Sequence, residues 1–289
     1  PDVAIVGAPY DDNTSNRPGA RFGPQAIRAR AYHPGTFNID LEIELFEKLK
    51  CVDYADAICQ AGMWEYSRKA IFDRVLEVAN RNIFPITIGG DHSIVNPAFS
   101  AIAEKYGKGK VGIIHFDAHA DTGNIVDGNL CSHGTPMRRL IESGAVKGEN
   151  FIQVGLRGYW PGTEEFQWMK DQGMRWHTME EVFKDGIQKV ISQALEEAKQ
   201  GTEFLYMSVD IDVLDPGFAP ATGTPAPGGM TPLELLKTVR RIALETNLVG
   251  MDLVEVSPPY DWADVTINNA HGVIWEVLSG LAYKKINSK

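Results

Sequence analysis

The chain has 289 residues, of which 44% are hydrophobic and 23% are charged, a composition that suits one large globular domain. Its net charge of −10 and its lack of a lysine or arginine block argue against nucleic acid or an anionic membrane surface as the main partner. No apolar run approaches the roughly 18 residues that span a bilayer, and three cysteines at spacings that match no zinc pattern favour a reduced, cytoplasmic protein. Because the sequence opens directly in a strand-like run, a further N-terminal extension is left open.

Short apolar runs alternate with amphipathic segments along the chain. The runs expected to form strands cover residues 2–7, 84–89, 110–116, 151–156, 204–210 and 248–256. Their near-continuous apolarity is typical of parallel strands that are buried on both faces. The segments expected to form helices cover residues 65–81, 96–107, 187–201, 231–246 and about 265–285. This alternation predicts a single α/β domain in which a parallel sheet lies between helical layers.

Four polar clusters each follow one of the predicted strands. They are GGDHS (89–93), DAHAD (117–121), DIDVLDP (210–216) and EVSPPYD (255–261). The carboxyl ends of parallel strands lie at one edge of a sheet, where ligands bind in open α/β folds. We therefore expect four segments that are remote in sequence to converge on one site.

The DAHAD segment carries the first sign of metal chemistry. Asp117, His119 and Asp121 share one side of an extended segment, because side chains in a strand alternate with period two. Asp210 and Asp212 repeat the arrangement, and His92 supplies a further nitrogen. A lone His is more often structural and a lone Asp-X-Asp is more often a turn or cap, but converging carboxylates without a cation would repel one another. The set predicts two divalent metal ions that share bridging carboxylates.

GGDHS, DAHAD and SVDIDVLDP together resemble the three metal-binding signatures of the ureohydrolase family, which includes arginase and agmatinase. The resemblance extends over nearly the whole chain through NRPGARFGPQAIR (16–28), ATGTPAPGG (221–229) and MDLVEVSPPYD (251–261). It is closest to the agmatinase-like branch, which includes guanidine and biguanide hydrolases. The resemblance implies one three-layer α/β/α domain over residues 1–289.

The resemblance also implies which residues hold the metals. One ion would bind His92, Asp117, Asp121 and Asp210, and the second would bind Asp117, His119, Asp210 and Asp212, with Asp117 and Asp210 as bridges. Manganese is the metal that the resemblance implies, and the same ligands are compatible with nickel. All six positions hold the expected residue type, so the sequence gives no sign of a metal-free relative.

A guanidinium carbon is a poor electrophile, so its hydrolysis needs a strong nucleophile at neutral pH. Water shared by two divalent ions can supply hydroxide, and Asp121 is expected to accept its proton. By resemblance, Glu255 would bind the guanidinium N–H groups and His133 would shuttle a proton to the leaving nitrogen. The remaining histidines, His33, His115, His177 and His271, are interpreted as structural, and His115 is expected to pack beneath the metals.

The sequence leaves the guanidino substrate open. The region TGNIVDGNLCSHG (122–134) lacks the serine pattern with which arginase grips an amino acid, which disfavours arginine. Agmatine would need an anion for its ammonium group, for which Asp127 and Asp261 are candidates. Aromatic residues in GMWEY (62–66), GYWPG (158–162) and YDW (260–262) could wall the cavity or simply pack in the core. Three substrates stay open: agmatine or another guanidinoalkyl compound, free guanidine, and an alkylated biguanide.

Two alternative functions lie outside this class. A deacetylase on the related metal-dependent fold would use a single zinc ion, so the number of metal ions distinguishes it. A non-catalytic partner subunit of an active paralogue would be expected to have lost ligands, which this sequence retains. The resemblance further implies a homo-oligomer, either a trimer or a hexamer, with a hetero-oligomer that includes a paralogue as a further option.

Overall fold

The computed structural model describes residues 1–30 and 35–287, so His33 lies outside the described residues. Eight parallel strands form the central sheet, in the order β4-β1-β5-β10-β9-β6-β7-β8. The strands are β1 (Val3–Ala8), β4 (Cys51–Asp56), β5 (Phe84–Gly89), β6 (Val111–Phe116), β7 (Phe151–Leu156), β8 (Arg175–Thr178), β9 (Phe204–Asp210) and β10 (Leu248–Val254). A separate two-stranded hairpin consists of β2 (Phe37–Asn38) and β3 (Ile43–Glu44).

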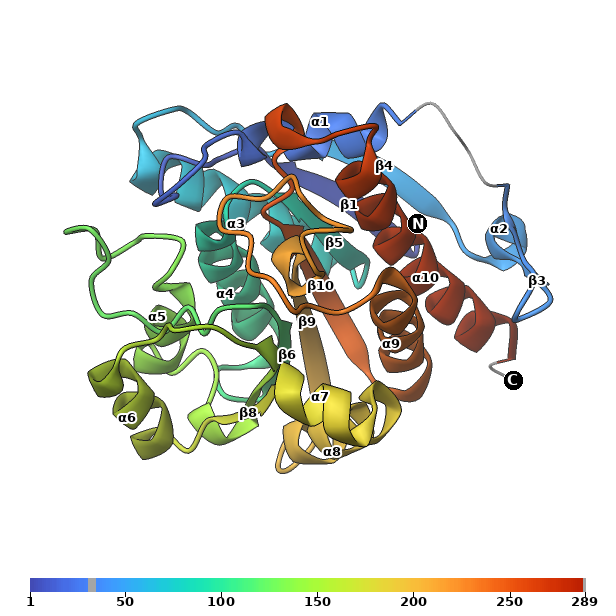
Figure 1. Ribbon diagram of the computed structural model, residues 1–289. Coiled ribbons are helices and arrows are strands. Elements are labelled where there is room, and N and C mark those ends of the chain that lie inside the picture. The colour runs from blue at the N-terminus through green and yellow to red at the C-terminus, as the bar shows by residue number, and fades with distance from the viewer. Residues whose placement is uncertain (31–34, 288–289) are drawn as a thin grey trace.

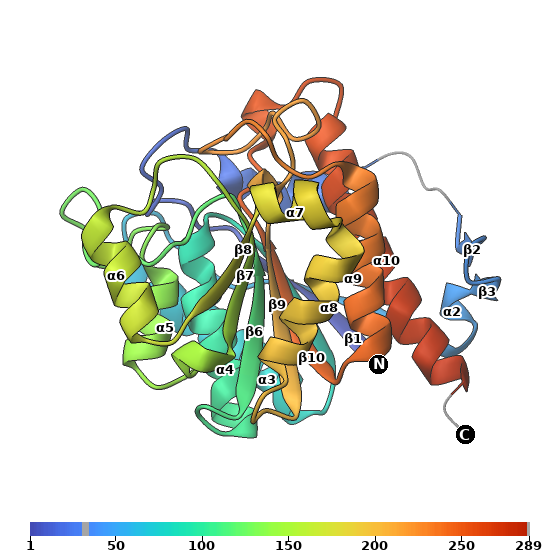
Figure 2. The same ribbon diagram turned by 60° about the horizontal axis from the view of Figure 1, so that its bottom comes forward.

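Helices cover both faces of the sheet, as the two views show (Figures 1 and 2). The helices are α1 (Gly23–Arg28), α2 (Leu45–Lys48), α3 (Trp64–Asn80), α4 (Val95–Tyr106), α5 (Pro136–Glu142), α6 (Thr163–Asp171), α7 (Met179–Asp185), α8 (Ile187–Ala198), α9 (Pro232–Glu245) and α10 (Val265–Asn287). One apolar core joins α8, α9 and α10 to the sheet, and a second joins α3, α4 and α5 to the opposite face. The predicted three-layer α/β/α architecture is confirmed. Within the described residues, no helix combines the length and apolar character needed to cross a bilayer.

The structure contains each of the six predicted strands and five predicted helices, with ends shifted by three residues at most. Helix α9 begins as expected at Thr231, whose hydroxyl and the Glu234 carboxylate form a capping box. The edge strands β4 and β8 lack a buried apolar run, and four of the six residues in β4 are exposed. The sequence pattern therefore missed both edge strands, the β2–β3 hairpin, and the short helices α1, α2, α5, α6 and α7.

The four central strands β5, β10, β9 and β6 are neighbours in the sheet. Each is followed by one of the four polar clusters, so the clusters meet at one edge of the sheet as predicted. The turn after β5 is especially tight at Gly90, whose N–H donates to the Ala8 carbonyl and whose carbonyl accepts from the Glu255 N–H at 2.9 Å. A side chain at Gly90 would begin 1.9 Å from the Tyr10 carbonyl oxygen.

We expect Gly90→Ala to lower the free energy of unfolding by about 1–3 kcal/mol, because the Tyr10 backbone must move to admit a methyl group. Gly217→Ala is the matched control, since its methyl group would meet only a side-chain oxygen of Asp215, at 3.2 Å, and no backbone atom. Thermal unfolding of both variants at equal metal content measures the effect. Equal midpoints for the two variants would show that the turn adjusts freely.

Candidate metal centre

The first group of candidate ligands lies around His92, which follows β5. The Nδ1 atom of His92 lies 3.0 Å from Asp117 Oδ2, 3.0 Å from Asp121 Oδ2 and 3.2 Å from Asp210 Oδ2. All four side chains are buried, and Nδ1 makes no hydrogen bond. Burial by itself lowers the pKa of His92, yet the three carboxylates outweigh it and hold that pKa well above its usual value. The cluster therefore strongly favours positive charge between these side chains.

The second group lies around His119, on the other side of Asp117. The Nδ1 atom of His119 is 3.1 Å from Asp212 Oδ2 and 3.4 Å from Asp117 Oδ1. Asp117 thus presents one carboxylate oxygen to each group. Burial, and then the neighbouring Asp212 carboxylate, raise the pKa of Asp210 well above its usual value, which is another sign that this carboxylate cluster needs a cation.

The spacing of these atoms fits metal coordination. Ligands about 2.1 Å from one cation and at right angles to each other lie about 3.0 Å apart, close to the separations around His92. In the part of the chain that the structure describes, the groups able to hold a metal are His92, His115, Asp117 and Asp121, and Asp117, His119 and Asp212. The residues fit two cations that share Asp117, with Asp210 beside the first.

His115 is close enough to Asp117 to be grouped with the ligands, but its hydrogen bonds indicate a different role. The Gln153 amide nitrogen donates to the Ala120 carbonyl at 2.7 Å and to His115 Nδ1 at 2.9 Å. The proton of His115 is therefore on Nε2, which donates to Asp117 Oδ2 at 2.8 Å. His115 orients the shared carboxylate, a more specific role than the packing that the sequence predicted. The sequence did contain a sign of this role, because His115 belongs to the same two-residue alternation as the candidate ligands at positions 117, 119 and 121.

A row of buried polar side chains crosses the sheet beneath these ligands. Residues at the same level on five adjacent strands form it: Gln153 on β7, His115 on β6, Ser208 on β9, Asp252 on β10 and Thr87 on β5. The Ser208 hydroxyl donates to Asp252 at 2.7 Å and can therefore accept from His92 Nε2 at 2.9 Å. This arrangement leaves Nδ1 as the His92 nitrogen that faces the carboxylates and that could bind a cation in place of a proton. Such partners fix the orientation of metal-ligating histidines.

We expect Ser208→Ala to weaken metal binding by about 10–100-fold, because His92 loses the acceptor that fixes its tautomer. Removing a single buried hydroxyl leaves the core packing nearly unchanged. Metal affinity, measured by competition with a chelator, is the direct readout. Thr238→Ala removes a buried hydroxyl in α9, away from the ligands, and should leave that affinity unaltered. Equal affinities in the two variants would contradict this role for Ser208.

His133 lies beside the ligands on the loop that follows β6. Its Nδ1 faces Glu255 Oε1 at 2.9 Å, and its Nε2 faces the Ser15 hydroxyl at 2.7 Å and the Ser15 N–H at 3.1 Å. Because a backbone N–H can only donate, it can meet Nε2 only when the ring is neutral; a protonated Nε2 would instead donate to the Ser15 hydroxyl, and Nδ1 keeps its proton toward Glu255 in both states. Burial lowers the pKa of His133, but the Glu255 carboxylate, together with the charges of Asp121 and Asp91, outweighs burial and raises that pKa to about 9. Nε2 is therefore the atom that gains and loses a proton.

Glu255 is positioned by the backbone as well as by hydrogen bonds. Its Oε1 also accepts from the His92 N–H at 2.8 Å, so one carboxylate oxygen connects the candidate ligand to His133. Glu255 and Asp121 have φ values of +64° and +54°, in the left-handed region that costs a non-glycine residue about 1–3 kcal/mol. Strained backbone of this kind clusters at functional sites. The structure places Glu255 against His133, and its predicted contact with a guanidinium group stays a prediction.

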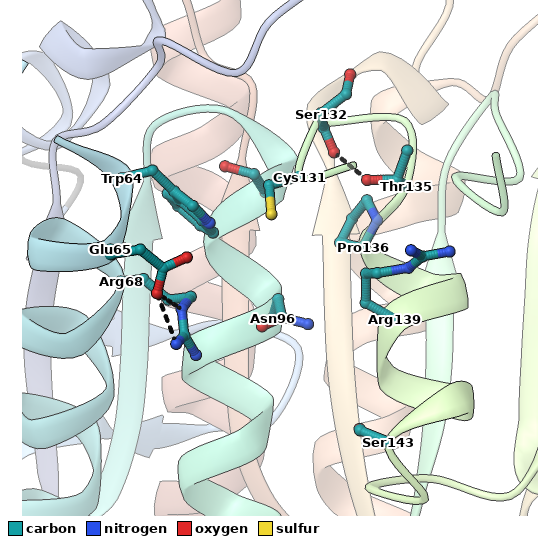
Figure 3. Close-up of a pocket in the computed structure, with 11 residues that line it drawn as sticks. Trp64, Glu65, Arg68, Asn96, Cys131, Ser132, Thr135, Pro136, Arg139 and Ser143 are labelled. Atoms are coloured by element: carbon teal, nitrogen blue, oxygen red, sulfur yellow. Dashed lines mark hydrogen bonds and ion pairs between the residues drawn. The ribbon is translucent and has the colours of Figure 1, made fainter. Parts of the chain in front are cut away.

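A cavity of about 240 Å³ opens onto both the ligands and His133. It is lined by Ser15, His119, Asp121, Val126, His133, Gly134, Trp160, Asp210 and Thr224. A second cavity, of about 260 Å³, lies among α3, α4 and α5 (Figure 3). Its Arg68 pairs with Glu65 at 2.8 Å, and the two candidate metal groups do not line it. The first cavity is therefore the candidate reaction site.

The other predicted candidates lie outside the reaction cavity. The Asp261 carboxylate accepts from three backbone N–H groups, those of Trp262, Thr266 and Ile267, and so caps α10. Asp127 is exposed and is not among the residues lining the cavity. His177 lies against Glu197 at 3.2 Å, and His271 accepts from the Trp275 indole at 2.8 Å. Neither histidine lines the reaction cavity, and their structural role stays a prediction.

Comparisons with known proteins agree with this geometry. Residues 1–280 match the arginase family. The chain is 38% identical to mitochondrial agmatinase from Gallus gallus over 96% of this chain and 80% of that protein. It is 37% identical to guanidinobutyrase from Pseudomonas aeruginosa, over 96% and 85% of the two chains. The structure of proclavaminate amidinohydrolase from Streptomyces clavuligerus superimposes with a TM-score of 0.89 at 36% identity, covering 98% of this chain and 92% of that one.

Proposed function

Because the chain belongs to the arginase family and is an amidinohydrolase of guanidino C–N bonds, we propose that it hydrolyses a small guanidino compound with two divalent metal ions. The substrate is an agmatine-type guanidinoalkyl compound, free guanidine or an alkylated biguanide. Water adds to the guanidinium carbon and one C–N bond breaks, which gives urea or a substituted urea and an amine or ammonia. The observation that carries this proposal is the shared carboxylate of Asp117, whose two oxygens face His92 and His119.

We propose that His92, Asp117, Asp121 and Asp210 hold one ion and that Asp117, His119, Asp210 and Asp212 hold the second. Manganese is the first candidate and nickel the second, because both accept imidazole and carboxylate ligands. When bound, two divalent ions lower the pKa of a shared water so that it can act as a nucleophile near neutral pH. The unpartnered Nδ1 of His92 among three carboxylates supports this assignment.

The surrounding side chains would carry out the proton transfers. Asp121 lines the cavity beside His92, where its carboxylate can orient the attacking water and accept its proton. His133 Nε2 can then deliver a proton to the leaving nitrogen, without which the tetrahedral adduct reverts to substrate. Glu255 holds His133 through Oε1. Its other carboxylate oxygen, Oε2, faces Gly223, where no side chain blocks it; a Cβ atom built on Gly223 would lie 3.2 Å from Oε2. We propose that Oε2 accepts a guanidinium N–H.

Urea release by manganese-loaded and nickel-loaded protein tests the proposal. The substrate panel is guanidine, agmatine, and a dialkyl biguanide, with guanylurea measured for the last. Release from at least one substrate, together with two metal ions per chain by elemental analysis, is the expected result. No product from any of the three would contradict the proposed function. A single zinc ion per chain with amide cleavage would instead support the deacetylase alternative.

The assembly implied by the resemblance is also a proposal. The β2–β3 hairpin lies at the edge of the molecule in both views (Figures 1 and 2) and exposes Phe37 at 57% and Ile39 at 80%. An apolar surface of this kind is typical of a contact between subunits. We propose a homo-trimer or homo-hexamer, which light scattering of the purified protein distinguishes from a monomer.

A further inference from the structure

The cavity above the metal ligands has a charged floor and uncharged walls. His119, Asp121, Asp210 and His133 form the charged part, and Ser15, Val126, Gly134, Trp160 and Thr224 complete the lining. Resting on the function proposed above, we infer that the site is specific for guanidines whose substituent carries no second charge. The substrate class is thus guanidine itself and its small N-alkyl derivatives, and Trp160 is the residue that sets this specificity.

The apolar wall is formed by Trp160 and Val126, which pack over two glycines beside His133. A Cβ atom at Gly123 would lie 2.9 Å from Val126 Cγ2 and 3.3 Å from Trp160 Cζ2, and a Cβ at Gly134 would lie 3.5 Å and 3.6 Å from the same two side chains. The indole and the valine methyl group therefore lie against the backbone of the loop that carries His133. An aromatic face suits a planar cation or an alkyl group and offers nothing to a carboxylate. An ammonium group would be attracted to the indole face but would find no carboxylate partner in this wall.

A second charge on the substrate would lack a partner. An ammonium group needs an anion, but Asp261 is occupied in capping α10, and Asp127 is exposed and is not itself among the residues that line the cavity. A carboxylate needs a cation, but the Arg157 guanidinium donates to backbone carbonyls, including those of Asp212 and Ala226 at 2.7 and 2.8 Å. Among the described residues that line the cavity, the charged groups are the candidate ligands and His133. Burying an unpaired charge is costly, so a charged tail disfavours binding.

The test compares kcat/KM for guanidine, N-methylguanidine and N,N-dimethylguanidine with kcat/KM for agmatine and 4-guanidinobutanoate, using urea release by the metal-loaded enzyme. We expect each of the first three to exceed both charged-tail compounds by at least about tenfold, the factor that 1.4 kcal/mol represents. A preference for agmatine or 4-guanidinobutanoate would overturn the inference while leaving the proposed function intact. No urea from any of the five would also overturn the inference, and the proposed function would fall with it only if a dialkyl biguanide released no guanylurea either.

Substitution of Trp160 tests which residue sets the preference. Trp160→Ala should lower kcat/KM for N,N-dimethylguanidine about tenfold and change kcat/KM for guanidine less, because the alkyl groups lose the indole surface. Trp160→Phe keeps an aromatic wall and should retain most of kcat/KM for N,N-dimethylguanidine. This variant separates loss of the wall from misfolding. Trp262→Ala removes an indole that is 78% exposed and does not line the cavity, and it should leave both values unaltered. Equal losses for the two substrates in folded Trp160→Ala would overturn the role of Trp160.

Discussion

Replacing Asp117 with asparagine should lower kcat/KM at least about a thousandfold and reduce the metal content of the purified protein. Asparagine keeps the shape of the side chain but removes the negative charge that faces both His92 Nδ1, at 3.0 Å, and His119 Nδ1, at 3.4 Å. Because both candidate metal groups share this carboxylate, one substitution weakens both. A loss of several kcal/mol in stabilising the reacting atoms corresponds to a factor of this size. Urea release and elemental analysis measure the two effects.

Asp127→Asn is the control, because it makes the same chemical change at an exposed position outside the cavity. It should leave metal content and activity at the level of the unsubstituted protein. Full activity of Asp117→Asn with both metals retained would refute the two-metal mechanism. Activity with one retained zinc ion would favour the single-zinc alternative.

The position of the metal centre was predictable because buried parallel strands have a strong sequence signature. Strands β5, β6, β9 and β10 are near-continuous apolar runs, and each leads into a polar cluster. The topology then brings the four ends together, since these strands are neighbours in the sheet. Alternation alone predicted that Asp117, His119 and Asp121 share one side, although the backbone at Asp121 turns into the left-handed region.

The supporting residues were harder to predict, because their partners are remote in sequence. Ser15 lies 118 residues from His133, and nothing near position 15 indicates that its hydroxyl would face an imidazole. Ser208 and Asp252 face each other only because β9 and β10 pair in that register. Ser208 did carry a signal, since it precedes Asp210 and Asp212 at the same two-residue spacing. Single polar residues in apolar strands are therefore worth examining whenever the strand ends in ligands.

His133→Asn should lower kcat by about 10²–10⁴-fold, the usual contribution of a positioned proton donor. The pH dependence gives the more specific test. Glu255 raises the pKa of His133 from its ordinary value near 6.5 to about 9, so the proton on Nε2 is present below that pH and is lost as pH rises through it. For the unsubstituted protein we expect kcat to fall on the alkaline side as this proton is lost. In His133→Asn that limb should disappear along with most of the activity.

Glu255→Gln tests whether the Glu255 carboxylate is what raises the pKa of His133. Without the Glu255 charge, burial is opposed only by the charges of Asp121 and Asp91, so the pKa of His133 falls and the alkaline limb should move to lower pH. The same sign applies to stability: an imidazolium whose pKa is raised by folding stabilises the native state fully below about pH 6.5, and this contribution fades as pH rises through about 9. Thermal unfolding of Glu255→Gln should therefore lose part of that pH dependence. If the alkaline limb stays at the same pH in both His133→Asn and Glu255→Gln, a group other than His133 supplies the proton.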